Sequence, residues 1–292
     1  MSVELTGGDF RIVIDPVLGG AIVAANWRDV PIFTPLDPEL APFKTGCFAM
    51  LPFTNRIADG QFRFDGHDYQ LAINNQDENV AIHGLSRDRP WSLTHCTSHS
   101  VILVQHFAER GNPYEYWARQ EISLLEAGLR IDVSICNAGD RPMPFGLGIH
   151  PWFARSPGTK LLFVSNGTCE QDDRNLPLPQ FRQVPAFDPE HSIALDDIPW
   201  LDGCFVGWAS QHARIERPHD NLAIDIEATG ALRHLHVFVP DNRNVFCAEP
   251  VSHVPDAINR PGLGQSCAMD VLAPGAVLSG AMTLRASPYS PV

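Results

Sequence analysis

The sequence predicts an all-β fold, a large β-sandwich formed by a single domain over residues 1–292. Short runs that alternate apolar and polar residues recur along the whole chain, and clusters of turn residues separate them. Glycine and proline, with 22 and 25 residues, punctuate the chain at short intervals. A sustained helical repeat of apolar residues is missing, and many short strands with turn signals between them favour a sandwich.

The clearest single element is a hairpin over Gln61–Leu71. Phe62 and Phe64 alternate with polar residues, and Asp65-Gly66 provides the turn. Proline, aspartate and glutamine are frequent over Gln171–Trp200, which predicts a long surface excursion. The other predicted strands, in chain order, are 10–14, 21–27, 100–107, 117–125, 129–136, 161–164, 213–216, 222–226, 235–239, 269–272 and 277–284.

Composition and charge restrict the classes of partner. Hydrophobic residues make up 44% and charged residues 19% of the chain, as in a globular protein with a sizeable core. The formal net charge of −13 argues against nucleic acid and against an anionic membrane surface. Seven scattered cysteines without CxxC spacing indicate reduced thiols, and neither a signal peptide nor a membrane-length apolar run is recognised. We expect a cytoplasmic protein, with the choice between monomer and homodimer left open.

An acid follows one of the most apolar runs of the chain. Val245–Ala248 reads as a strand that returns after the turn Pro240–Asn242, and it leads into Glu249 and Pro250. A carboxylate placed at the end of a strand is well positioned to face a cleft. The alternative is a solvated acid, which is the commoner fate of such residues.

Two stretches in the N-terminal third combine polar groups with apolar neighbours. Asn55 and Arg56 follow an apolar approach, and the guanidinium can donate several hydrogen bonds to hydroxyl or carboxylate oxygens. The alternative is an arginine that braces a loop by pairing with an acid. His83 follows three apolar residues and precedes Gly84, which permits close approach of a backbone or ligand. A core histidine bonded to a carbonyl is the alternative there.

Two further stretches place polar groups beside aromatic residues. His150 ends a strand interrupted by glycines and is followed by Pro151 and Trp152. Asp202 lies beside a turn glycine, close to Phe205. The aromatic residues suit the apolar face of a sugar ring, and the carboxylate suits its hydroxyl groups. The alternatives are a core aromatic cluster and an aspartate that caps its own turn.

Other kinds of site find little support. His234 and His236 share one strand face, but no third metal ligand is visible beside them. Phosphate-binding glycine loops and a Gly-x-Ser-x-Gly elbow are absent from the sequence. We therefore expect neither a metal nor another cofactor.

Taken together, these stretches resemble the aldose 1-epimerase (galactose mutarotase) family. Any one motif is weak, but the ordered set extends over about two hundred residues. The resemblance implies a large antiparallel β-supersandwich and a small-molecule sugar substrate. The matching residues are Asn55-Arg56-Ile57, the hairpin from Gly60 to Leu71, His83-Gly84, His150, Asp202 with Phe205, Glu249-Pro250 and Pro255-Asp256-Ala257.

The resemblance also implies roles for individual residues. Glu249 is similar to the general base of the family, and His150 to its general acid. Arg56, His83 and Asp202 are similar to its sugar contacts, and we count Asn55, Trp152 and Phe205 as further substrate-binding residues. The expected reaction opens the hemiacetal with a carboxylate and an imidazolium on opposite sides of one pocket.

The sequence departs from the best-known members at both histidines. Leu85 stands where those members have a second glycine, and the second histidine lies in Gly-Ile-His-Pro-Trp-Phe. These departures indicate a diverged branch and leave the sugar undetermined. Two other functions stay open. One is a mutarotase for hexose 6-phosphates, for which Arg87 and Arg89 are the nearby basic residues. The other is a non-catalytic carbohydrate-binding module.

Overall fold

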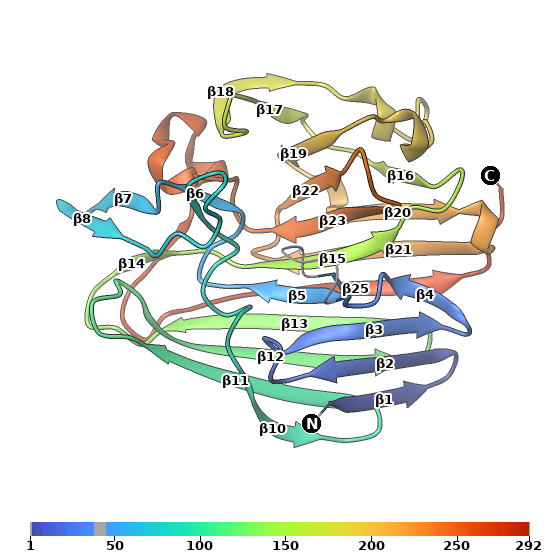
Figure 1. Ribbon diagram of the computed structural model, residues 1–292, viewed down its shortest axis with the longest axis horizontal. Coiled ribbons are helices and arrows are strands. Elements are labelled where there is room, and N and C mark those ends of the chain that lie inside the picture. The colour runs from blue at the N-terminus through green and yellow to red at the C-terminus, as the bar shows by residue number, and fades with distance from the viewer. Residues whose placement is uncertain (1, 38–44, 292) are drawn as a thin grey trace.

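A computed structural model describes residues 2–37 and 45–291 of the chain. Within these residues the protein forms two large sheets of antiparallel strands, eleven in one and eight in the other (Figure 1), which confirms the all-β prediction. The larger sheet contains β1 (Val3–Gly7), β2 (Phe10–Asp15), β3 (Ala21–Trp27), β4 (Val30–Phe33), β5 (Cys47–Met50), β15 (Gly148–Ala154), β17 (Thr168–Gln171), β18 (Pro177–Arg182), β19 (Leu201–Phe205), β22 (His234–Val239) and β23 (Val245–Val251). The smaller sheet contains β10 (Ser92–Cys96), β11 (Ser100–Ala108), β12 (Glu115–Leu125), β13 (Gly128–Asn137), β16 (Lys160–Phe163), β20 (His212–Arg217), β21 (Leu222–Gly230) and β25 (Val277–Ser287).

Short elements connect and flank the two sheets. Three two-stranded pairs are formed by β6 (Arg56–Ala58) with β9 (Val80–Ile82), β7 (Gln61–Phe64) with β8 (His67–Gln70), and β14 (Met143–Phe145) with β24 (Asp270–Leu272). The short 3-10 helices are η2 (Pro185–Phe187), η3 (Leu195–Asp197), η4 (Ala209–Gln211), η5 (Pro218–Asp220), η6 (Ala257–Asn259), η7 (Pro261–Leu263) and η8 (Gln265–Cys267).

The hydrophobic core lies between the two large sheets. The long strands β11 and β12 of the smaller sheet alternate, so that in β12 the side chains of Tyr116, Ala118 and Ile122 are buried while their neighbours face outward. This alternation is typical of an antiparallel sheet with one solvated face. Side chains of the larger sheet, among them Ile12 and Val237, join the same buried cluster. The sandwich is therefore closed by apolar contact between the inner faces of the two sheets.

The central strands of the larger sheet are buried on both faces. All of β23 is buried, and β15 is buried except at Ala154. The inner face of these strands contacts the core, and the outer face borders a cavity that is also lined by residues of β6 and β9. Polar side chains on this covered outer face need partners, because buried polar groups without them cost free energy.

Most predicted strands are present, with one error. The hairpin at Gln61–Leu71 forms β7 and β8, and the strands predicted on either side of Pro240–Asn242 form β22 and β23. The surface excursion predicted for Gln171–Trp200 is partly wrong. The segment contains β18, which extends the larger sheet beyond β17, and its Phe187 and Leu195 are buried.

Candidate active site

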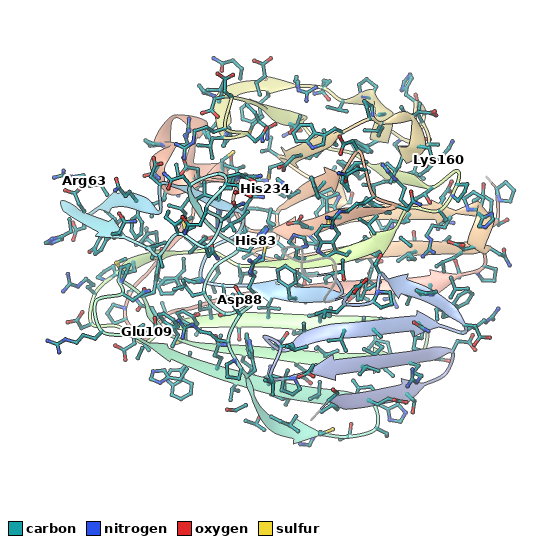
Figure 2. The ribbon with its side chains drawn as sticks, in the orientation of Figure 1. Arg63, His83, Asp88, Glu109, Lys160 and His234 are labelled. Atoms are coloured by element: carbon teal, nitrogen blue, oxygen red, sulfur yellow. The ribbon has the colours of Figure 1, made fainter. Side chains whose placement is uncertain are left out.

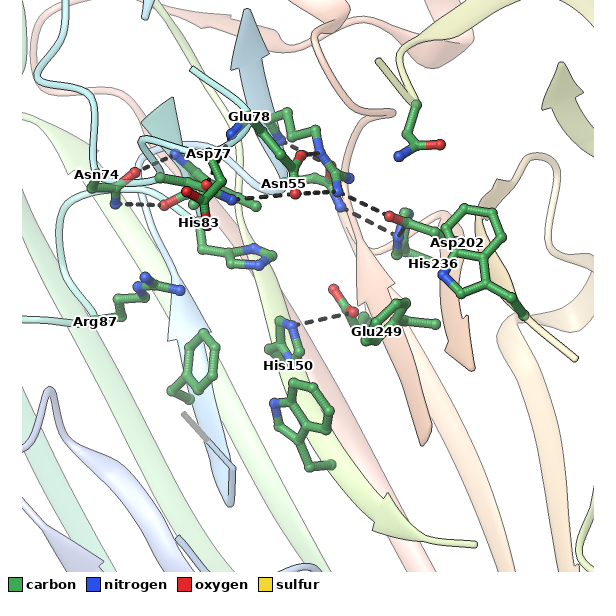
Figure 3. Close-up of a pocket in the computed structure, with 18 residues that line it drawn as sticks. Asn55, Asn74, Asp77, Glu78, His83, Arg87, His150, Asp202, His236 and Glu249 are labelled. Carbon is green, nitrogen blue, oxygen red and sulfur yellow. Dashed lines mark hydrogen bonds and ion pairs between the residues drawn. The ribbon is translucent and has the colours of Figure 1, made fainter. Parts of the chain in front are cut away.

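A cavity of about 500 Å³ lies against the outer face of the larger sheet. Its floor is made by adjacent strands, which contribute Phe48, His150, Trp152, Glu249, His236, Phe238 and Asp202. Its walls come from the short strands β6 and β9 and from loops, which together contribute Asn55, Arg56, Asn74, Asn75, Asp77, Glu78, Ile82, His83, Arg87, Asn175 and Trp200 (Figure 3). The sheet thus fixes one half of the site, and variable connections supply the other.

Strand register places four of these side chains in one row. Phe48 of β5 pairs with His150 of β15, and Glu249 of β23 pairs with His236 of β22. The pairs on either side in β15 and β23 set His150 opposite Glu249. Directly opposite side chains in antiparallel strands lie close together on one face. Residues that are far apart in sequence therefore meet across four neighbouring strands.

The pairing between β15 and β23 is interrupted at this row. The two strands pair at Gly148–Val251 and at Trp152–Cys247, with no pair between these two. Each strand carries a proline in the gap, Pro151 in β15 and Pro250 in β23. Proline has no N–H to donate to a ladder, and it is unusual in a central strand for that reason.

His150 and Glu249 contact each other at the floor of the cavity. The distance from His150 Nε2 to Glu249 Oε1 is 3.3 Å (Figure 3). They lie side by side, so the expected arrangement on opposite sides of the pocket is wrong. Glu249 is also not at a strand end, because β23 continues to Val251. Among the described residues, neither His150 Nδ1 nor Glu249 Oε2 has a hydrogen-bond partner, although both atoms are buried.

Burial keeps both members of this pair uncharged at neutral pH. It raises the pKa of Glu249 to about 8, against the opposing effect of His236. Burial also lowers the pKa of His150 well below its ordinary value, and the positive charge of Arg87 adds to this effect. The two groups then hold one exchangeable proton between them, located on the carboxyl group. Such opposed shifts in a cleft are characteristic of acid–base sites.

His83 extends over the row from the loop after β9. It adopts a left-handed backbone conformation with φ of 61°, and Gly84 follows with φ of 75°. A Cβ atom on Gly84 would lie 2.0 Å from the carbonyl oxygen of Leu51, so this turn requires glycine, as the sequence predicted. The turn brings the His83 ring edge-on to His150, with ring centroids 4.8 Å apart. Burial lowers the pKa of His83 well below its ordinary value.

Arg56 is held by three partners. Its Nη2 donates to Asp202 Oδ2 at 3.0 Å, and its Nη1 donates to Asn55 Oδ1 at 3.1 Å. Its Nε donates to Glu78 Oε2, and Nη2 also donates to Glu78 Oε1 at 3.2 Å. The bracing role considered for this arginine is therefore correct, and it is compatible with a place in the cavity wall.

Asp202 connects the arginine to a histidine that the sequence analysis set aside. His236 Nε2 is 2.8 Å from Asp202 Oδ1 and 3.3 Å from Asn55 Nδ2. Burial alone raises the pKa of Asp202, but the charges of Arg56 and His236 outweigh it and lower that pKa to about 2. Burial lowers the pKa of His236, but the bond to Asp202 and the carboxylates of Glu249 and Asp202 together raise it above its ordinary value. A chain of contacting polar side chains, Glu78, Arg56, Asp202 and His236, thus ends beside Glu249.

The cavity contains most, but not all, of the residues expected from the sequence. Arg56, His83, His150, Asp202, Glu249, Asn55 and Trp152 line it. Phe205 does not, because it packs in the core against Phe163 and Phe187, so its assignment as a sugar contact is wrong.

The sequence analysis did not place several of the lining residues in the site, among them His236, Glu78 and Trp200. A signal for His236 existed in its position on β22, where alternation puts it on the same face as Phe238. Glu78 and Trp200 lie in connections between strands, and no local sequence pattern predicts where the side chains of these connections point.

The basic residues considered for a phosphate do not gather at the cavity. Arg87 lines it, but Arg89 pairs with Glu109 at 2.6 Å and lies over the ring of Phe107. Among the described residues that line the cavity, Asp77 and Glu78 stand near the same mouth. This arrangement does not provide the basic cluster that a phosphate would need.

His83, His150 and Glu249 are the residues that come nearest to a metal-binding set. One ligand atom from each lies within 4.8 Å of the other two. The positively charged guanidinium of Arg87 acts on this group, which disfavours a cation. His234, in contrast, bonds to the carbonyl oxygen of Ser266 and shares no ligand position with His236.

Comparisons with known proteins agree with this geometry. A family model described as aldose 1-epimerase matches residues 1–285. The chain is 31% identical over 274 residues to the uncharacterized protein YphB of Escherichia coli K12, covering 91% of the chain and 92% of YphB. It is 32% identical over 276 residues to the uncharacterized protein YihR of the same organism, covering 88% of the chain and 86% of YihR.

A solved structure gives the same result. A crystal structure of a candidate aldose 1-epimerase from Escherichia coli K12 superposes with a TM-score of 0.87 at 27% identity, covering 99% of both chains. The resemblance inferred from the sequence is confirmed by these matches. Among the described residues, no helix is long and apolar enough to cross a membrane.

Proposed function

The chain belongs to the aldose 1-epimerase family, and from this premise we propose that it interconverts the α and β anomers of an aldose by acid–base ring opening. Glu249 is the general base and His150 the general acid. The observation that carries the proposal is their 3.3 Å contact at the floor of a cavity, with one unpartnered polar atom on each among the described residues. Buried polar atoms without partners are the places where a ligand compensates the cost of burial.

The proton count of the pair suits the reaction. Moving the shared proton from Glu249 to His150 gives a carboxylate and an imidazolium without any exchange with solvent. The carboxylate then takes the proton from the anomeric hydroxyl, O1, while the imidazolium gives its proton to the ring oxygen, O5. The C1–O5 bond breaks, C1=O1 forms, and rotation about C1–C2 exposes the other face of the aldehyde. Ring closure reverses both transfers, so protons and electrons balance.

The side-by-side geometry is compatible with this scheme. O1 and O5 are both bonded to C1, so an acid and a base on adjacent strands can reach both oxygens of one carbon. His83 lies against His150 and contributes to the same end of the cavity. Holding the sugar here supplies the orientation that makes intramolecular proton transfer efficient.

The charges of the cavity favour a neutral sugar over a phosphorylated one. Arg56 is already paired with Glu78 and Asp202. Arg87 then faces a wall that also carries Asp77. A doubly negative phosphate would meet carboxylates as well as the guanidinium, and like charges within a few ångströms are unfavourable. Neutral hydroxyl groups can hydrogen-bond to all of these side chains.

The test is mutarotation of freshly dissolved α-glucose and α-galactose, followed by polarimetry. Glu249→Gln and His150→Asn should each lower turnover on the order of a hundred- to ten-thousand-fold, while Glu190→Gln on the exposed surface should match the wild type. Either site variant turning over at the wild-type rate would refute its assignment. Wild-type protein that binds sugars in calorimetry without accelerating mutarotation would instead support a carbohydrate-binding module.

A further inference from the structure

The outer part of the cavity contains groups that the proposed acid–base chemistry does not use. Trp200 lines the cavity and is nevertheless 45% exposed. Asn175 and Asp77 line it too, from two different loops. A cavity of about 500 Å³ is within the range that encloses ligands larger than one sugar ring. The question is what these groups at the mouth would bind.

The mouth is a fixed structure, because contacts join its two loops. Arg174 donates to Asp59 Oδ1 at 3.0 Å and to the carbonyl oxygens of Glu78 and Asn79 at 3.4 Å each. On the other side, Gln171 Nε2 donates to the carbonyl oxygen of Asp202 at 2.7 Å. The loop that carries Asn175 is therefore tied both to the loop before β9 and to the floor strand β19.

The side chains at the mouth differ in whether their polar atoms already have hydrogen-bond partners within the protein. The amide of Asn74 bonds both N–H and C=O of Ile82. The amide of Asn75 accepts from the N–H of Glu78 and donates to its carboxylate oxygen Oε1. Among the described residues, the side chains of Asp77, Asn175 and Trp200 have no such bond. These three groups offer acceptors, an amide and an amphipathic indole surface to a ligand.

We propose that Trp200, Asn175 and Asp77 form an outer sugar subsite, and that the preferred substrate is the reducing end of a disaccharide or longer saccharide. This inference rests on the proposed function, because it places C1 of the reducing unit at Glu249 and His150. The far end of that ring, where a second sugar is attached, then points toward the mouth. The indole takes the apolar face of the second ring, and the carboxylate and amide take its hydroxyls. The carboxylate of Asp77 disfavours an anionic extension.

The test compares kcat/KM for mutarotation of glucose and galactose with that of maltose, cellobiose, lactose and melibiose. Anomeric exchange can be followed by NMR at equilibrium, which needs no pure anomer. At least one disaccharide should equal or exceed its monosaccharide. Trp200→Ala should then lower the ratio of disaccharide to monosaccharide kcat/KM by tenfold or more. Asn175→Ala should lower this ratio as well.

Trp117→Ala provides the matched control. Trp117 is 52% exposed and stacks on His106 in the smaller sheet, outside the cavity lining. The Trp117→Ala variant should leave kcat/KM unchanged for both monosaccharides and disaccharides. The proposal is overturned if all four disaccharides fall below a tenth of their monosaccharides, or if Trp200→Ala lowers both classes equally.

Binding separates failure of this inference from failure of the proposed function. Methyl glycosides cannot open their rings, so calorimetry with methyl maltoside and methyl glucoside reports affinity without turnover. Methyl maltoside should bind more tightly, and Trp200→Ala should remove the difference. If the protein accelerates mutarotation of none of the sugars but still binds methyl maltoside more tightly, the proposed enzymatic activity is refuted and the outer subsite is supported. If the protein accelerates mutarotation but binds the two methyl glycosides equally, the outer subsite is refuted and the proposed enzymatic activity is supported.

Discussion

Replacing Glu249 with glutamine should make the protein more stable while it removes activity. Burial raises the pKa of this carboxyl group from 4.5 to about 8, so the folded state holds a proton that the unfolded chain releases near neutral pH. A raised folded-state pKa gives full stability below the unfolded value and progressive loss as pH rises. Each pH unit above the pKa of the unfolded carboxyl group lowers the free energy of unfolding by about 1.4 kcal/mol, up to the pKa of the folded state. Folding with a protonated Glu249 therefore costs about 3 kcal/mol at about pH 7.

Glutamine has nearly the same shape and carries no ionisable proton, so it avoids this cost. Urea unfolding of wild type and Glu249→Gln should differ by about 3 kcal/mol at about pH 7 in favour of the variant. The difference should become small at a pH close to 4.5, where the unfolded carboxyl is also largely protonated. A variant less stable at neutral pH, or a difference independent of pH, would refute the assigned burial and protonation of Glu249.

Two further predictions concern the same cavity. The kcat/KM for mutarotation should fall above a pH of about 8, because Glu249 and His150 lose their shared proton there. It should also fall in acid, where protonation of His150 gives the pair a second proton. Initial rates measured across pH and corrected for the spontaneous reaction would show both decreases, and a kcat/KM that stays constant above a pH of about 8 would contradict the prediction. Glu78→Gln should raise KM by about tenfold with a smaller change in kcat, because Arg56 loses one of its two charged partners while the reacting groups stay in place. Glu109→Gln is its control, since Glu109 lies well away from His83 (Figure 2), and equal effects of both variants on KM would exclude a positioning role for Glu78.

The sequence predicted the elements better than it predicted their contacts. Alternation and turn residues were sufficient for the hairpin β7–β8 and for β22 and β23, because these signals are local. The family resemblance supplied residues such as Arg56, His83 and Asp202, which the structure places in one cavity. Cross-strand neighbours could not be predicted, because they depend on strand order and register.

Two errors illustrate the missing information. Phe205 and Trp152 are both aromatic residues near predicted site residues, but only Trp152 points into the cavity. The face on which each side chain lies depends on the exact start of its strand. His236 was set aside as a weak metal ligand, because its partner Asp202 lies on β19, the neighbouring strand in space and not in sequence.

The row of side chains across β5, β15, β23 and β22 restricts how this protein can evolve. Inserting or deleting one residue in any of these strands turns its contribution toward the core and disables the site. Changes of length are tolerated only in the connections, and those before β9, between β17 and β18, and before β19 form the mouth of the cavity. New sugar preferences should therefore arise from insertions and substitutions in these three connections, while the reaction chemistry is inherited unchanged with the sheet.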